Sequence, residues 1–412
     1  SLLDELGLSQ DIVAPHPSGA WVQLPDGAEE LPKAGVLGIP SNPWDPEVRS
    51  ALGIWGSFRA SFDRFLPVRT QRDHASVADL VRARMGRRVL ERLVTPVVGG
   101  VHSADPALLD IDMVAPGLRA LMAQHGSLAQ AVAAQRARTA GAHGGAKAGS
   151  AVAGLRGGMN RLVDALVARL TDDGVDLVSG ERAERLDRLE NGWRVGTESL
   201  DGAVSSEREA EIVVVALGGP AAVELLSDAV PELAGHEPVP GPEVKLVTLV
   251  LDKPELDARP RGTGVLVAPQ ARGIQAKALT HATAKWGWLA DEAGPGTHVL
   301  RLSYGRAQDP DGAAEREPHT DDELFRAALA DASALLGISI TFDDVLGWDV
   351  VRWEGSLPFA TVGHRERVAE IRQLVAAQPG LAVVGGWAAG NGLASVVPDA
   401  RSQARELMAR IA

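Results

Sequence analysis

The fold is decided by the stretch Leu381-Ala-Val-Val-Gly-Gly-Trp-Ala-Ala-Gly-Asn-Gly-Leu393, near the end of the sequence. Its four apolar residues up to Val384 predict a short buried strand, and a helical run follows Leu393. Glycine has no Cβ, so the backbone of the connecting turn can approach a phosphate or a flat cofactor, and a helix N-terminus offers unpaired N–H groups. The stretch therefore favours a cofactor-binding strand–turn–helix, although a tight turn without a ligand has the same pattern.

A second strand–turn–helix pattern lies in the middle of the chain. Glu211-Ile-Val-Val-Val-Ala-Leu217 predicts a buried strand, and Gly218-Gly219-Pro220 leads into a helix with proline near a favoured first position. Further strands are predicted at 175–179, 182–189, 193–198, 243–251, 264–268, 275–280, 298–304 and 346–353. A cofactor domain split in sequence around a substrate domain has this layout, so we predict an α/β fold of mixed α+β character.

The composition is that of a globular protein, with 45% hydrophobic and 23% charged residues among 412. The net charge of −13 argues against nucleic-acid binding, which needs a basic face. The chain has no cysteine, which excludes disulfides and thiolate catalysis, and its ten histidines form no metal-ligand pattern. We find neither a signal peptide nor an apolar run long enough to cross a bilayer, and we therefore predict a cytoplasmic protein.

A helical pattern extends from about Arg49 to Arg138, with Ser76 and Asp79 as a predicted capping pair. One side of this region carries Arg82, Arg84, Arg87, Arg88 and Arg92. A solvated face is the simpler interpretation, and contact with anionic lipid or propionate groups is the alternative. Residues 139–153 lack an apolar face and predict a mobile loop, after which Gly158 opens an amphipathic helix.

Short motifs along the whole chain carry a family resemblance. They are Leu2-Leu-Asp-Glu-Leu-Gly-Leu8, Lys33-Ala-Gly-Val-Leu-Gly-Ile-Pro40, Ser76-Val-Ala-Asp-Leu80, Pro96-Val-Val-Gly-Gly-Val-His-Ser-Ala-Asp-Pro106, Gly154-Leu-Arg-Gly-Gly-Met159, Lys277-Ala-Leu-Thr280, Lys285-Trp286, Val351-Arg-Trp353, Val362-Gly-His364 and the glycine turn at 385–392. In this order they resemble the FAD-dependent protoporphyrinogen/coproporphyrinogen oxidases, in particular the soluble bacterial coproporphyrinogen III oxidases of haem biosynthesis. The more distant amine oxidases share the split FAD domain but lack the Gly-Val-His-Ser-Ala-Asp-Pro segment.

The sequence departs from the family at its start. The family opens with a strand, a Gly-x-Gly-x-x-Gly turn, a helix and an acidic residue for the adenosine ribose, a unit of roughly 30 residues or more. This sequence begins at Ser1 with a helical segment that ends at Gly7, so we expect that an N-terminal segment has been lost from it. A form that cannot hold FAD normally is the alternative. Smaller departures from the family pattern are Gly287, Phe359, Ala360 and Asn391.

The resemblance implies positions for the cofactor and the substrate. Along the ribityl chain and flavin ring it implies Gly385, Gly386, Trp387, Gly390, Asn391, Gly392 and Leu393. Near the adenosine end it implies Ala183, Ala216 and Leu217, and near the isoalloxazine Trp353 and Pro358, with a core aromatic as the alternative for Trp353. Arg59, Lys277 and Lys285 are candidates for the substrate carboxylates, or else ordinary surface charges. No catalytic base is identified.

The implied activity is oxygen-dependent oxidation of coproporphyrinogen III or protoporphyrinogen IX by FAD. A truncated, non-catalytic relative that binds porphyrin or a haem-pathway partner is one alternative, and a flavin amine oxidase-like enzyme is another. Peripheral membrane contact and contact with ferrochelatase are compatible with the resemblance, and the oligomeric state is left open. The implied domains are a split FAD-binding domain (154–226 and 363–412), a mixed-sheet substrate domain (1–56 and 227–362) and a helical domain (57–153).

Overall fold

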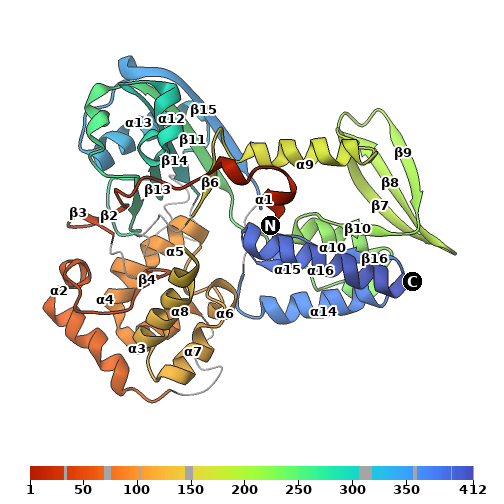
Figure 1. Cartoon of the computed structure of the whole chain (residues 1–412), viewed down its shortest axis with the longest axis horizontal. Coiled ribbons are helices and arrows are strands. Elements are labelled where there is room, and N and C mark those ends of the chain that lie inside the picture. The colour runs from red at the N-terminus through yellow and green to blue at the C-terminus, as the bar shows by residue number, and fades with distance from the viewer. Residues whose placement is uncertain are drawn as a thin grey trace. The chain divides into compact units, whose positions relative to one another are not determined.

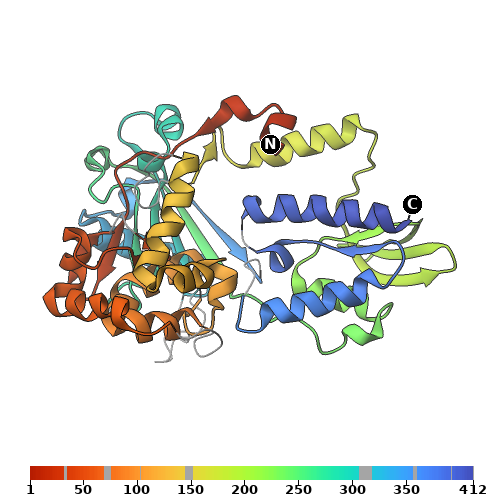
Figure 2. The ribbon, with the colours of Figure 1, turned by 60° about the horizontal axis from the view of Figure 1, so that its bottom comes forward.

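The structure is a computed structural model, and it describes residues 1–31, 35–68, 76–102, 104–143, 152–305, 318–355, 360–390 and 392–411. The chain divides into two compact units (Figures 1 and 2). Unit 1 consists of Ser1–Leu2, Asp164–Gly241 and Gly355–Ala412, and unit 2 of Leu3–Val163 and Pro242–Glu354. Each unit is therefore assembled from segments that are far apart in the sequence.

Unit 2 is built on a seven-stranded sheet with the order β15-β11-β14-β13-β12-β2-β3. Neighbouring strands are antiparallel except for the parallel pair of β12 and β2. The strands are β2 (Trp21–Leu24), β3 (Gly27–Glu30), β11 (Val244–Asp252), β12 (Gly264–Val267), β13 (Ala278–His281), β14 (Thr297–Tyr304) and β15 (Val345–Trp353). The strands predicted between 243 and 353 are thereby confirmed.

Helix α13 (Asp321–Leu336) covers one face of this sheet. Its N-terminus is fixed by a capping box, in which the Thr320 hydroxyl accepts from the Glu323 N–H and the Glu323 carboxylate accepts from the Thr320 N–H. Leu324, Leu335 and their apolar neighbours on α13 pack against alternate residues of the central strands, such as Leu249 and Leu302. Because side chains of a strand alternate between faces, the intervening residues lie on the opposite face of the sheet.

The remainder of unit 2 is mostly helical. Its helices are α2 (Pro46–Ser61), α3 (Val77–Met85), α4 (Arg87–Val89), α5 (Thr95–His102), α6 (Ile111–Val114), α7 (Leu118–His125), α8 (Leu128–His143), α11 (Ala282–Lys285) and α12 (Gly287–Ala293). Two short strand pairs complete it, β1 (Ile12–Val13) with β6 (Gly154–Leu155) and β4 (Gly35–Val36) with β5 (Ile39–Pro40). The predicted cap of α3 is confirmed, since the Ser76 hydroxyl accepts from the Asp79 N–H. The loop predicted at 139–153 begins later, because α8 continues to His143, and its residues 144–151 lie outside the described residues.

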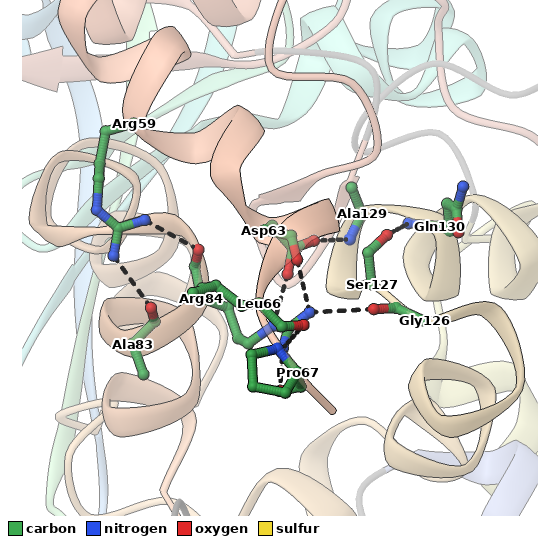
Figure 3. Close-up of polar contacts among 10 residues, drawn as sticks. All are labelled: Arg59, Asp63, Leu66, Pro67, Ala83, Arg84, Gly126, Ser127, Ala129 and Gln130. Carbon is green, nitrogen blue, oxygen red and sulfur yellow. Dashed lines mark hydrogen bonds and ion pairs between the residues drawn. The ribbon is translucent and has the colours of Figure 1, made fainter. Parts of the chain in front are cut away.

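The buried side chain of Arg84 connects several of these helices through an ion pair and hydrogen bonds (Figure 3). Arg84 of α3 forms an ion pair with Asp63 at 2.6 Å and donates to the carbonyls of Asp63, Leu66, Pro67 and Gly126. The second carboxylate oxygen of Asp63 accepts from the Ala129 N–H at the start of α8. One charge pair thus joins the turn that follows α2, the last turn of α3 and the connection between α7 and α8.

Unit 1 contains the parallel pair β10 (Val213–Val215) and β16 (Leu381–Val383), and the antiparallel sheet β7 (Glu181–Leu189), β8 (Gly192–Ser199) and β9 (Ser205–Ala210). Its helices are α10 (Gly219–Ser227), α14 (His364–Ala376), α15 (Gly386–Ala389) and α16 (Leu393–Ile411), which contains Pro398. Two helices, α1 (Leu2–Glu5) and α9 (Asn160–Asp172), each cross a boundary between the units. Trp193 of β8 is buried and donates its indole N–H to the Pro379 carbonyl, which joins the three-stranded sheet to the segment before β16.

The prediction of a strand at 175–179 is wrong. In the structure these residues have no strand partner within the described chain, and Val175, Leu177 and Val178 are almost half exposed. Apolar residues favour a strand locally, but a strand forms only where a neighbouring strand can accept its backbone hydrogen bonds. Among the described helices none has both the length and the apolar character needed to cross a membrane.

Candidate cofactor and substrate sites

The two glycine-rich turns found in the sequence meet in unit 1. Strands β10 and β16 are parallel neighbours, with Val213 opposite Leu381 and Val215 opposite Val383. Because parallel strands end at the same edge of a sheet, the turns that follow them are brought side by side. The indole N–H of Trp387 donates to the Leu217 carbonyl at 3.2 Å, which ties one turn to the other.

This meeting of turns requires small residues. A Cβ on Gly219 would lie 3.1 Å from the Trp387 ring, so a larger side chain would push the two turns apart. Gly385, with a φ of 136°, and Gly392, with a φ of 98°, have backbone conformations that L side chains rarely adopt. A Cβ on Gly392 would meet no atom within 4 Å among the described residues, so the backbone there faces open space.

A buried histidine supports the second turn. His364, at the N-terminus of α14, is 1% exposed, and its Nε2 lies 2.6 Å from the Trp387 carbonyl oxygen. A carbonyl only accepts, so Nε2 carries the proton and donates it. In the sequence His364 belongs to the family motif Val362-Gly-His364, and no role was predicted for its side chain. Gly363, the residue before it, has a left-handed backbone conformation with a φ of 82°. A glycine at this position is the one local sequence signal of that conformation.

The two turns are open enough to fit a flat cofactor. Ala216, Leu217 and Gly218 are exposed, and neither Gly218 nor Gly392 has an atom within 4 Å of where a Cβ would be. The first turn of α16 begins at the half-exposed Leu393 and contains no acidic residue. Its N-terminal N–H groups therefore present a partial positive charge that no carboxylate of that turn offsets. These features fit the ribityl and flavin half of FAD, and the chain contains no Gly-x-Gly-x-x-Gly motif to which the adenosine half could be assigned.

The structure places the implied cofactor residues as follows. Ala216, Leu217, Gly385, Gly386 and Trp387 are brought together, with Gly390, Gly392 and Leu393 following in the same turn. The Trp387 ring is 5% exposed and packs in the core of unit 1, so its contribution is to brace the turn. Ala183 lies on β7 in the separate three-stranded sheet. Pro358 and Asn391 lie outside the described residues.

The remaining candidates belong to unit 2. Trp353 ends β15 and is 51% exposed. Arg59 donates to the carbonyls of Arg84 and Ala83 at the end of α3 (Figure 3). Lys277 is 1% exposed and its ammonium donates to the Gly305 carbonyl at 2.9 Å. Arg59 and Lys277 thus both serve the fold, and their role toward a substrate stays a prediction.

Lys285 has a different environment. Its ammonium lies 5.4 Å from the centre of the Trp286 ring. Burial lowers the pKa of Lys285, and the nearby guanidinium of Arg301 lowers it further. Two cations therefore lie close together at this point of unit 2. Sequence reasoning missed Arg301, because a single arginine in an alternating strand pattern gives no signal of its own.

Two buried histidines of unit 2 lie in contact with each other. His281 Nε2 lies 3.0 Å from His298 Nδ1, and His298 Nε2 lies 3.2 Å from an Asp257 carboxylate oxygen. Burial, together with the charge of His298, lowers the pKa of His281 to about 3, so His281 is neutral at physiological pH. Within the described residues no three His, Asp or Glu side chains are placed to hold a metal ion.

Comparison with known proteins identifies the family. Residues 1–411 match the family of flavin containing amine oxidoreductases. The chain belongs to this family. As a flavin-containing amine oxidoreductase it is an FAD-dependent enzyme, and the predicted resemblance, α/β fold class and cofactor are confirmed.

Individual relatives agree with this assignment. The coproporphyrinogen III oxidase of Propionibacterium freudenreichii is 29% identical, over 99% of this chain and 78% of its own length. That of Mycobacterium leprae is 29% identical, over 100% of this chain and 84% of its own length. A crystal structure of a proposed protoporphyrinogen oxidase from Exiguobacterium sp. superimposes with a TM-score of 0.77 at 23% identity, over 99% of this chain and 84% of that one, and shows the same fold.

Proposed function

We propose that this flavin-containing oxidoreductase oxidises coproporphyrinogen III to coproporphyrin III in haem biosynthesis, with O2 as the electron acceptor. The observation that carries the proposal is the run of curated coproporphyrinogen III oxidases that match 96–100% of this chain at 24–29% identity. A chloroplastic protoporphyrinogen oxidase of rice matches 97% of the chain at 25% identity. Protoporphyrinogen IX is therefore the second candidate substrate.

The chemistry is a six-electron oxidation. Each of three rounds removes a hydride and a proton from the porphyrinogen and reduces one O2 to H2O2, so that three O2 are consumed for each porphyrin formed. FAD supplies the two-electron redox chemistry when it is bound. The protein has to bind the tetrapyrrole, orient the reacting carbon and hold the cofactor in a fixed position.

The residues of unit 1 that would hold the flavin are those of its two glycine-rich turns. The backbone at Gly392 faces open space, and Trp387 and His364 brace the turn before it from the core side. The N-terminus of α16 would favour negative charge on a bound group. Ala183, Trp353 and Pro358 stay candidates for cofactor contact, and Lys285 for substrate contact.

Several partners follow from the same proposal. Porphyrinogen and O2 are the substrates, and delivery of porphyrin to a ferrochelatase is the protein contact we propose. We place the enzyme in the cytoplasm, with a peripheral membrane contact as an option that exposed Trp55 and Phe65 on the helical part of unit 2 would support.

The test is oxidation of freshly reduced substrates by the purified protein after incubation with FAD. Porphyrin fluorescence and H2O2 are followed with coproporphyrinogen III, protoporphyrinogen IX and a primary amine in parallel. We expect coproporphyrinogen III to react fastest and to give three H2O2 for each porphyrin. Turnover of the amine alone would identify an amine oxidase. Porphyrin binding without turnover by a flavin-loaded sample would identify a non-catalytic relative, and either result would refute the proposal.

A further inference from the structure

Arg301 lies in the middle of a row of hydroxyl-bearing residues on the sheet of unit 2. Strand β14 is flanked by β11 and β13, and Arg301 is directly opposite Thr248 on one side and Thr280 on the other. Residues paired in this way have Cβ atoms about 5 Å apart, so the two hydroxyls flank the base of the arginine side chain. Ser303 lies two residues further along the same face of β14, between Leu246 and Ala278.

This row is on the face of the sheet that α13 does not cover. The residues adjoining Arg301 along the strand, Leu300 and Leu302, are fully buried in the core beneath α13. Side chains alternate between the two faces, so Arg301 points to the opposite side. Arg301 is exposed, and Thr248, Thr280 and Ser303 are only partly buried. The row is therefore accessible within unit 2.

The charge of this row is not compensated by a neighbouring carboxylate. No ion pair or hydrogen bond joins the Arg301 guanidinium to another side chain in the described parts of the chain. Asp349 continues the row on β15, but it is opposite Thr248 and thus two strand spacings, about 10 Å, from Arg301. The second cation, Lys285, is close enough to Arg301 for the two charges to influence each other. A pair of cations beside the hydroxyls of Thr248 and Thr280 is a suitable environment for a carboxylate.

An apolar surface adjoins the row on the same face. One register step from Arg301, the sheet presents Val351, Leu246 and Ala278 across three strands, and Trp353 lies at the end of β15. Leu266 of β12 belongs to this surface and is in contact with α5 at Gly100. A flat apolar ring could lie on these residues while an acidic side chain reached the cationic row.

We propose that Arg301, with Thr248 and Thr280, binds a carboxylate side chain of the tetrapyrrole, whose ring lies on the apolar surface of Leu246, Val351 and Trp353. This inference rests on the proposed function for the identity of the ligand. It assigns the selectivity for acidic porphyrins to a residue that sequence patterns did not reveal. Arg301 is a substrate-binding residue in this assignment and has no part in the redox chemistry.

The test is equilibrium binding of the product coproporphyrin III and of its tetramethyl ester to the FAD-loaded protein, measured by quenching of tryptophan fluorescence. The variants are Arg301→Gln and Arg301→Lys, and the matched control is Arg352→Gln, an arginine of the same sheet that points to the α13 face and pairs with Asp321. We expect Arg301→Gln to weaken binding of coproporphyrin III roughly 10-fold or more and to leave binding of the ester unchanged. Arg301→Lys should restore part of the loss.

The outcomes separate the inference from the proposed function. If the wild-type protein oxidises coproporphyrinogen III and Arg301→Gln binds the product as tightly as the wild type, the assignment of Arg301 is wrong while the proposed function stands. An equal loss of affinity for the acid and for the ester would also overturn the assignment. That pattern indicates that the substitution changed the structure, because the loss of a charge contact would weaken binding of the acid alone. If the wild type neither binds coproporphyrin III nor oxidises its precursor, the proposed function itself fails.

Discussion

Replacing Arg84 by methionine is expected to destabilise the helical part of unit 2 severely. The side chains of Arg84 and Asp63 are 6% and 2% exposed, and their ion pair is 2.6 Å long. Methionine keeps the apolar stem of the arginine but leaves a buried carboxylate without its cation. Removing one partner of a buried ion pair costs about 3–5 kcal/mol. The carbonyls of Leu66, Pro67 and Gly126 lose their donor at the same time.

The size of the expected effect makes the assay straightforward. For domains of 150–250 residues, 1 kcal/mol corresponds to roughly 2–4 °C in melting temperature, so Arg84→Met should lower it by at least about 6 °C. The control is Arg82→Met on the same helix. Arg82 is 58% exposed and 3.6 Å from Asp79, a surface pair that contributes about 0–1 kcal/mol. Thermal unfolding followed by circular dichroism would compare the two variants with the wild type.

A second variant tests the physical reason. In Arg84→Met with Asp63→Asn, the asparagine oxygen can still accept from the Ala129 N–H, but the buried charge is gone. The double variant should therefore be more stable than Arg84→Met alone. The reasoning is refuted if Arg84→Met melts within about 2 °C of the wild type, or if the double variant is the less stable of the two.

Three further outcomes follow from the two sites. Folding lowers the pKa of His281 from 6.5 to about 3, so the stability that its neutral form contributes is fully present above pH 6.5. This stability is lost as the pH falls toward 3, by up to about 1.4 kcal/mol per pH unit. The urea midpoint of unfolding should therefore fall more steeply between pH 7 and pH 5 for the wild type than for His281→Gln. Gly392→Val should lower the FAD content of the purified protein, because a φ of 98° is strained for valine. The control is Gly287→Val, which lies in open space with an ordinary φ and should keep a normal FAD content. An equal FAD content in both variants would contradict the role of the turn. His364→Phe should lose the hydrogen bond to the Trp387 carbonyl and bind FAD more weakly in a flavin titration, and unchanged affinity would show that the turn holds its shape without the histidine.

Local sequence patterns were sufficient to predict those structures whose stabilising contacts are between residues close together in the sequence. The strand, glycine turn and helix from Leu381 onward were predicted in their observed order, because an apolar run and a series of glycines restrict the backbone at short range. The same holds for the Ser76 cap. The strand predicted at 175–179 was wrong, since strand formation depends on a partner that local sequence does not specify.

The sequence by itself determined the fold class and, through motifs spread along the whole chain, the flavin-containing family. Only the tertiary structure decided which charges are available to a ligand. Lys277 and Arg301 are both cations in alternating strands, yet Lys277 is buried with its ammonium on the Gly305 carbonyl, whereas Arg301 is exposed between two threonines. The face to which a strand residue points, and what covers that face, are set by sheet register and by helices distant in the sequence, and no local pattern contains that information.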